Sequence, residues 1–357
     1  MKKIYTITFH SVLNHGAALQ TFALQKYLAS KGHDAILLNY IPTYFAYQTL
    51  RPAKGIRKTL LKYSRLVKFI RFSKQHIKKT DLLLSKASLN KLPRAHAVVC
   101  GSDQIWNPKL TNNHYDKAFF LDFVTFPTTK IAYAASAGGY LLSNAPIEIQ
   151  DMVARFDAIG VRESHLCEDI ISKKIHPDAH FVADPTLLIS DYSSIIDDRC
   201  TPRHEYIATY EVSSNTSREL LSKHAESLKA MTGLPVYHLG DKAIPAATKN
   251  LLNISPAQWV SLIKSAKYVI TNSFHGCAFA MNHEKQFIYV PHVEEEKNAR
   301  PYSLLNKVGL ESKVAREPNS TSIIFEKYDL KLLTSFIKES QKFLDKSIKI
   351  TTESKSE

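Results

Sequence analysis

His275 occupies a turn between an expected strand and an expected helix, where a histidine can transfer a proton. Residues 268–278 read YVITNSFHGCA: an apolar run ends in polar residues, and a helical pattern begins near His275. Backbone N–H groups and the positive end of the helix dipole favour an anion at such a turn. They also lower the pKa of a nearby histidine and suit it to acid–base chemistry near neutral pH. The alternative is that His275 caps the helix or lies in the core.

A second polar turn follows the apolar run that ends at Cys100, where residues 98–108 read VVCGSDQIWNP. Gly101 allows a close approach of the backbone. Asp103 and Asn107 could bind sugar hydroxyls, with Trp106 as a stacking face. The alternative is an Asx-type turn in which Trp106 belongs to the core.

A third strand end, residues 159–164, places Arg162 beside Glu163. An arginine there offers a planar pair of donors that fits a carboxylate or a phosphate. The alternative is a surface ion pair between the two neighbouring side chains.

Several common chemistries lack their sequence signatures. The chain has no G-x-G-x-x-G and no Walker-type loop, so nicotinamide and ATP-dependent chemistry lose their usual motif. Without H-E-x-x-H, an acidic cluster or closely spaced cysteines, we expect no metal and no cofactor. The four cysteines are far apart in sequence, which favours a reducing compartment, and Cys277 is read as a small apolar residue.

Strand and helix patterns alternate along most of the 357 residues. The opening predicts a strand at 4–9, a helix at 17–31 and a strand at 35–39, a β-α-β unit typical of a parallel sheet. Residues 181–188 are expected to form a strand ending at a proline turn. The polar segment 189–204 predicts a domain junction, and a second α/β series starts with a strand at 206–212. Two such halves usually bind a ligand in the cleft between them, at the carboxyl ends of the strands.

The positive charge is confined to the N-terminal region. The chain has 47 Lys+Arg, 33 Asp+Glu and a net charge of +14, while residues 1–90 hold 16 basic and 2 acidic residues, which is also +14. Residues 51–79 contain 11 Lys+Arg and no acid, interleaved with apolar residues. This pattern predicts a basic amphipathic helix that could lie on an anionic membrane or attract a lipid-linked acceptor. The alternative is a merely solvated charged face; nucleic-acid binding is not expected, because no known binding module surrounds the segment.

Six segments together resemble the polysaccharide pyruvyl transferase family. They are NHGAALQ at 14–20, GSDQIWNP at 101–108, YAAS at 133–136, VRE at 161–163, DPTLL at 184–188 and TNSFHG at 271–276. The segments occur in the order found in the family and extend over most of the chain. The resemblance implies an α/β fold of two Rossmann-like domains in a GT-B-like arrangement with a cleft between them. It also implies transfer of a pyruvyl group, usually as a ketal, from phosphoenolpyruvate to a sugar.

The resemblance also implies roles for individual residues. His275 would be the catalytic acid/base, and Arg162 would hold the carboxylate or phosphate of the donor. Asn272, Ser273 and Gly276 would line the same donor pocket. The residues that we predict on the acceptor side are Asn14, His15, Gly16, Asp103, Gln104, Trp106 and Asn107. Phosphoenolpyruvate would be a co-substrate, with no other cofactor and no metal.

One departure from the family pattern affects the donor. Other members carry Arg-Leu-His where this chain has Ser273-Phe274-His275. The missing arginine implies that Arg300 or a lysine holds the donor, or that the donor differs. A rival interpretation is a GT-B glycosyltransferase that uses a nucleotide sugar, with residues 294–296 supplying a carboxylate for the ribose. A second rival is a non-catalytic membrane-surface or glycan-binding protein.

The expected organisation completes the sequence prediction. An acceptor-side domain is expected at 1–195, including a basic helical segment at 51–90, and a donor-side domain at 204–330. A helix and a polar tail are expected at 331–357. No stretch has the 18 or more apolar residues of a transmembrane helix. We therefore expect a cytoplasmic enzyme, peripheral at the inner face of the membrane if the basic segment binds lipid, that acts in exopolysaccharide or cell-envelope glycan assembly.

Overall fold

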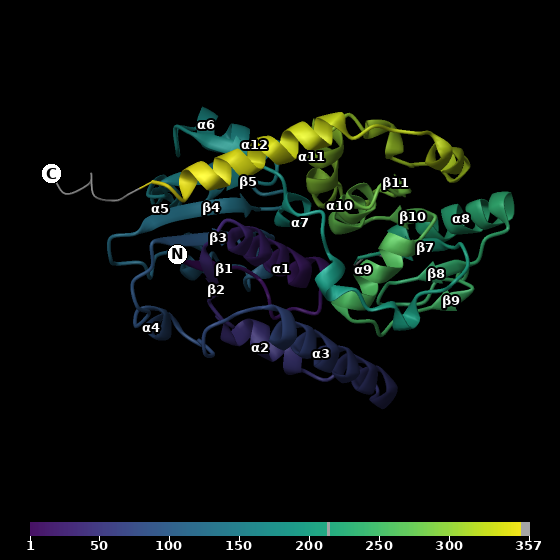
Figure 1. Ribbon diagram of the computed structural model, residues 1–357, viewed down its shortest axis with the longest axis horizontal. Coiled ribbons are helices and arrows are strands. Elements are labelled where there is room, and N and C mark those ends of the chain that lie inside the picture. The colour runs from purple at the N-terminus through teal and green to yellow at the C-terminus, as the bar shows by residue number, and fades with distance from the viewer. Residues whose placement is uncertain (213–214, 351–357) are drawn as a thin grey trace. The chain divides into compact units, whose positions relative to one another are not determined.

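A computed structural model describes residues 1–212 and 215–350 (Figure 1). Two compact units share the chain. The first unit comprises residues 1–52, 73–189 and the described residues from 335 onward, and the second comprises 53–72 and 190–334. This division differs from the expected one in three places. Residues 53–72 and 190–195 belong with the second unit, and most of the C-terminal helix belongs with the first.

The first unit contains a six-stranded parallel sheet in the order β2-β1-β3-β4-β5-β6. Its strands are β1 (Lys3–Ile7), β2 (Asp34–Leu37), β3 (Ala97–Gly101), β4 (Thr129–Ala135), β5 (Ala158–Val161) and β6 (Ala179–Phe181). β1 pairs with β2 on one side and with β3 on the other. The strand order therefore reverses between β1 and β3, and the loops after these two strands flank the switch point at which such sheets bind ligands.

The second unit contains a five-stranded parallel sheet in the order β11-β10-β7-β8-β9. Its strands are β7 (Ile207–Tyr210), β8 (Val236–His238), β9 (Lys249–Asn250), β10 (Tyr268–Thr271) and β11 (Gln286–Tyr289). Here the order reverses between β7 and β10. The loop that carries His275 follows β10 and so lies at the switch point of this sheet.

Helices connect and cover the strands of each sheet. They are α1 (His15–Ser30), α2 (Thr43–Leu50), α3 (Ile56–His76), α4 (Lys86–Leu89), α5 (Ile147–Ala154), α6 (Ser164–Ser172), α7 (Pro185–Leu188), α8 (Asn215–Thr232), α9 (Pro256–Ser265), α10 (Phe274–Asn282), α11 (Ala299–Lys307) and α12 (Lys331–Ser347). The expected strand at 181–188 is wrong beyond Phe181, where β6 ends. Asp184 caps a short helix there, because its side chain accepts a hydrogen bond from the backbone N–H of Thr186.

Buried apolar side chains fill both faces of each sheet, as parallel sheets require. In the first unit, aromatic residues such as Trp106, Phe119 and Phe120 pack on one face. Leu28, Ile131 and the side chains of α12 pack on the other. α12 is anchored there because the Tyr27 hydroxyl donates to Asp345 (2.9 Å). Among the helices of the described residues, none combines the length and apolarity needed to cross a membrane.

Candidate functional site

Asn272 joins the two strand ends at the switch point of the second sheet. Its side-chain oxygen accepts a hydrogen bond from the backbone N–H of Val212 (2.8 Å), and its amide nitrogen donates to the Val212 carbonyl (3.3 Å). Val212 follows β7 and Asn272 follows β10, so this residue fixes the separation of the two loops. Asn272 is itself buried. Asn272 therefore has a structural role: it holds together the two loops between which a ligand of this sheet would bind.

Helix α10 begins directly after Asn272, with Ser273 as its N-cap. Ser273 caps the helix by accepting a hydrogen bond from the backbone N–H of Gly276. A Cβ at Gly276 would lie 2.2 Å from Oγ1 of Thr271, so only glycine lets the first turn lie this close to β10. His275 lies in that first turn and is 6% exposed. The structure thus brings together the four residues predicted on the donor side of this strand end.

An ion pair between a buried carboxylate and a partly accessible arginine lies at the same switch point, and the sequence did not reveal it. Glu211 follows β7, and its Oε1 accepts hydrogen bonds from Nε (3.0 Å) and Nη2 (2.8 Å) of Arg218 at the start of α8. Burial raises the pKa of Glu211 in spite of the arginine. The only sequence signal is a charged residue near the end of the expected strand 206–212. Arg218 thus supplies a guanidinium group at the carboxyl end of β7. This strand is the neighbour of β10, which leads to His275.

His292 packs behind Asn272. Its Nε2 lies 3.0 Å from the Asn272 carbonyl, and the side chain of Asn298 accepts from the His292 backbone N–H (2.8 Å). Burial first, and then the positive charges of Lys297 and Arg300, lower the pKa of His292 to about 4. His292 is therefore neutral at pH 7. Arg300, the cation suggested by the sequence, thus lies near enough to this histidine to act on it electrostatically.

Two buried histidines predict that the second unit loses stability in acid. Burial lowers the pKa of His238, like that of His292, from 6.5 to about 4. The unfolded chain takes up protons as the pH falls below 6.5, whereas the native chain resists until about pH 4. Stability present above pH 6.5 should therefore decrease toward pH 4 by roughly 3 kcal/mol for each of the two histidines. Urea unfolding across this pH range measures the decrease in stability. A His238→Gln variant should show a shallower dependence of stability on pH. The control His180→Gln, at an exposed histidine, should show the same dependence as the unaltered protein.

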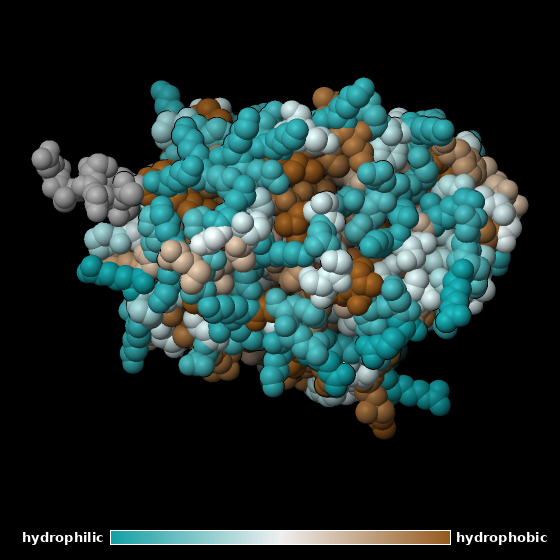
Figure 2. All heavy atoms as spheres, viewed as in Figure 1, coloured by the Kyte–Doolittle hydropathy of each residue, from teal (hydrophilic) through white to brown (hydrophobic). Residues whose placement is uncertain are grey.

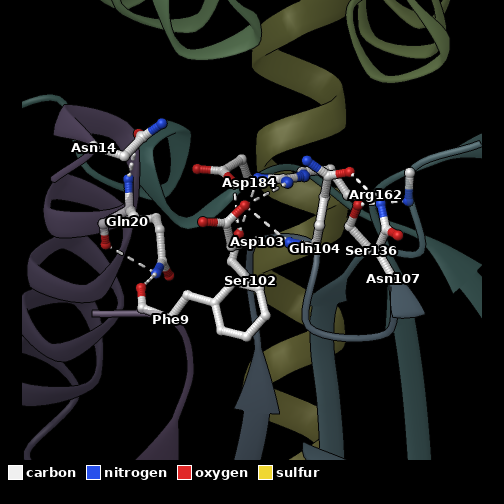
Figure 3. Close-up of polar contacts among 12 residues, drawn as sticks. Phe9, Asn14, Gln20, Ser102, Asp103, Gln104, Asn107, Ser136, Arg162 and Asp184 are labelled. Atoms are coloured by element: carbon white, nitrogen blue, oxygen red, sulfur yellow. Dashed lines mark hydrogen bonds and ion pairs between the residues drawn. The ribbon is translucent and has the colours of Figure 1, made fainter. Parts of the chain in front are cut away.

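The carboxyl ends of the first sheet carry a network centred on Asp184 (Figure 3). Its Oδ2 accepts hydrogen bonds from Nη1 of Arg162 (2.6 Å) and from the hydroxyl of Ser102 (2.6 Å). Its Oδ1 accepts from the hydroxyl of Thr186 (2.7 Å). The Thr8 hydroxyl donates to the Ser102 carbonyl (2.6 Å), which ties the end of β1 to the end of β3. The network therefore links several strand ends around the switch point.

Arg162 has surroundings that do not suit the predicted donor-binding role. Its side chain is 1% exposed, and Asp184, its ion-pair partner, is 0% exposed. Asp103 lies 3.7 Å from Nη2, and the buried Glu163 is also nearby and accepts a hydrogen bond from Ser136. Burial would lower the pKa of Arg162, but the carboxylates, Asp184 first, raise it above its usual value. Because these acids outnumber the arginine, the group does not attract a further anion, and the predicted role as a donor ligand is not supported.

Arg162 and His275 also belong to different units. A shared donor pocket is therefore not a property of either unit by itself.

The prediction that Trp106, in the turn after β3, stacks on the sugar acceptor is wrong. The indole is fully buried, donates its N–H to the Phe119 carbonyl (3.1 Å) and stacks on Phe120 at a centroid distance of 5.5 Å. It is a core residue and offers no face to a sugar. Asp103 and Gln104 of this turn are partly accessible, whereas Ser102, Ile105 and Asn107 are buried. Asp103 adopts a left-handed conformation (φ 71°), and the Gln104 side chain accepts from Asn107 (2.9 Å).

The turn after β1 contributes the remaining predicted acceptor residues. Asn14 caps α1, because its side chain accepts a hydrogen bond from the Ala17 backbone N–H (3.1 Å). His15 and Gly16 lie buried in the first turn of that helix. Gln20, one turn further, donates to the Thr8 hydroxyl (3.1 Å) and so joins α1 to the end of β1. It also donates to the Phe9 carbonyl (3.4 Å; Figure 3). The predicted acceptor residues after β1 and β3 thus flank one switch point.

Comparison with solved structures shows a fold shared over almost the whole chain. The S. aureus MnaA–UDP co-structure matches with a TM-score of 0.53 and 13% identity, covering 96% of this chain and 91% of that one. A putative UDP-N-acetylglucosamine 2-epimerase from Listeria monocytogenes matches with a TM-score of 0.51 and 11% identity, covering 98% and 91%. These likenesses establish the fold alone, two Rossmann-like domains of the GT-B class. A search of curated proteins finds no significant match.

The family assignment rests on the sequence. A family model described as polysaccharide pyruvyl transferase matches residues 14–292, more than half of the 357 residues. The matched range begins at the cap of α1 and ends at His292. It includes both switch points and every segment on which the resemblance was based. The chain therefore belongs to the polysaccharide pyruvyl transferase family.

Proposed function

We propose that this enzyme transfers a pyruvyl ketal from phosphoenolpyruvate to a sugar of a cell-surface glycan or of its lipid-linked precursor. The observation that carries the proposal is His275 in the first turn of α10, at the switch point of a family member's second sheet. In this reaction two sugar hydroxyls add to C2 of the donor, the methylene carbon gains a proton, and inorganic phosphate leaves. Atoms and electrons balance with no further reagent, and no cofactor is needed.

His275 would carry the proton. As the acid it would protonate the methylene carbon of phosphoenolpyruvate, and C2 would become positively charged and open to a sugar hydroxyl. As the base it would accept the hydroxyl proton. The N-terminus of α10 would stabilise the negatively charged donor, because its backbone N–H groups and dipole favour an anion. Asn272 and Ser273 would act by holding this helix end in place.

The positive charge for the donor would come from the second unit. Ser273 stands where other family members carry arginine, so a different cation must neutralise the phosphate and the carboxylate. Arg218 lies at the start of α8 and donates to Glu211, which follows β7. The charge of Arg300 lowers the pKa of His292, which contacts Asn272 after β10. Both arginines are partly accessible. We propose Arg218 as the principal donor ligand and Arg300 as the second.

The sugar acceptor would bind at the switch point of the first unit. Asp103, Gln104 and Asn107 after β3 and Asn14 after β1 offer carboxylate and amide groups that suit hydroxyls. The acids around Arg162 make this strand end a poor place for a phosphate and a good one for a neutral sugar. We place the reaction in the cytoplasm, where phosphoenolpyruvate is available.

Binding of the donor can be tested without knowing the acceptor. Phosphoenolpyruvate at about 100 times its Kd should stabilise the protein by about 2.7 kcal/mol, seen as a rise of several degrees in Tm. Arg218→Gln should abolish the rise, while Arg199→Gln, at an exposed arginine paired with Asp197, should keep it. No response to phosphoenolpyruvate together with a clear rise with a nucleotide sugar would identify the protein as a GT-B glycosyltransferase instead.

A further inference from the structure

Helix α3 is attached to the second unit by one side. Arg65 forms an ion pair with Asp241 in the loop after β8, and Nζ of Lys68 donates to the Asn253 carbonyl (2.6 Å). Phe69 and Phe72 are buried on the same side. These contacts fix which face of the helix is turned inward. The basic segment predicted from the sequence is therefore a docked helix with a defined outer face.

The outer face of α3 carries an apolar stripe. Ile56, Leu60, Val67 and Ile70 recur at intervals of three, four and seven residues, which places them in one row along the helix. They are 80%, 63%, 55% and 55% exposed. The positions of Arg65, Phe69 and Phe72 fall on the opposite side of the same helix. Apolar side chains protrude among hydrophilic ones over the outer end of α3 (Figures 1 and 2). An ordinary solvated helix would place polar residues along this row.

The charges that α3 itself carries around the stripe all have one sign. Arg57 and Arg71 adjoin its two ends in sequence and are exposed, and Lys74, also exposed, continues the row by one turn. No acidic residue occurs between Asp34 and Asp81. A surface of apolar residues bordered by cations is complementary to anionic lipid, whose headgroups attract the cations while the acyl region takes up the apolar side chains.

We propose that the outer face of α3 binds the surface of an anionic membrane. Helix α3 lies parallel to that surface, inserts the apolar stripe and sets its arginines among the lipid phosphates. The proposal does not depend on the donor or on the reaction. It places the second unit of the enzyme at the surface from which a lipid-linked glycan would be presented.

Vesicle co-sedimentation tests the proposal. The protein should bind vesicles of phosphatidylcholine mixed with phosphatidylglycerol, and bind pure phosphatidylcholine far more weakly. Arg57→Gln/Arg71→Gln should weaken the binding roughly thirty-fold, as expected for two cations near an anionic surface. Leu60→Ser/Val67→Ser should weaken it by a comparable factor. The control Lys91→Gln/Arg94→Gln removes two exposed cations of the first unit and should bind as the unaltered protein does.

Two further measurements separate this proposal from its rivals. An Ile56→Trp variant should show a blue-shifted emission with anionic vesicles if the stripe enters the lipid. An unshifted emission, or binding equal in all variants, would overturn the proposal. Binding to duplex DNA that survives Leu60→Ser/Val67→Ser, with no binding to vesicles, would assign the surface to nucleic acid. Unchanged Tm values would show that the variants are folded.

Discussion

His275→Gln is expected to lower kcat by about 10²–10⁴-fold and to leave the binding of phosphoenolpyruvate nearly unchanged. Glutamine keeps a polar side chain in the first turn of α10 but cannot donate and recover a proton at neutral pH. The backbone groups of that turn, which would hold the donor, stay in place because Ser273 caps the helix. The measurement is phosphate release from phosphoenolpyruvate in the presence of a glycan acceptor, with the donor Kd determined separately.

The control for this prediction is His180→Gln, at an exposed histidine on β6. It should retain full activity. A decrease of less than a few-fold in His275→Gln would remove His275 from the chemistry and leave it as a helix-terminal packing residue. Loss of donor binding together with loss of kcat would instead make His275 a binding group.

Arg162→Met is expected to destabilise the first unit by about 3–5 kcal/mol, because it leaves Asp184 charged and buried without its partner. Asp184→Asn should be less destabilising, since Asp103 and Glu163 still act on the buried Arg162 after Asp184 has lost its charge. The double variant Arg162→Met/Asp184→Leu removes both charges and should recover most of the lost stability. Urea unfolding of the three variants measures these differences.

Arg155→Met provides the matched control, because Arg155 is exposed at the end of α5. It should change stability little. The competing interpretation, that Arg162 holds the donor, predicts the reverse pattern. Arg162→Met would then be as stable as the unaltered protein and would fail to bind phosphoenolpyruvate. The two interpretations are therefore separated by comparing stability with donor affinity.

Local patterns in the sequence were enough to predict the strand ends that matter. The alternation at 4–39 predicted β1, α1 and β2, and the apolar runs before Gly101 and Asn272 predicted β3 and β10 within about one residue. Both runs end in polar residues because the chain leaves the buried sheet there. The same local signal placed His275 in the first turn of a helix, and the structure confirms that position.

Contacts between distant residues could not be predicted in this way. The charge pattern predicted a basic amphipathic helix, but not that Arg65 pairs with Asp241, 176 residues later, and so attaches the segment to the second unit. Arg162 has the composition of an anion site, and only the fold shows that Asp184 neutralises it. A tryptophan in a polar turn likewise resembles a stacking platform until the packing of Phe119 and Phe120 around it is seen.

The most direct test of the proposed reaction follows carbon from the donor. Phosphoenolpyruvate labelled with ¹³C in the methylene carbon should be incubated with the protein and with glycan and lipid-linked glycan from cells that produce it. The account predicts a labelled methyl group of a pyruvate ketal on the glycan, with one phosphate released per ketal and neither product with His275→Gln. A glycan that gains a sugar from a nucleotide sugar and no label from phosphoenolpyruvate would contradict it.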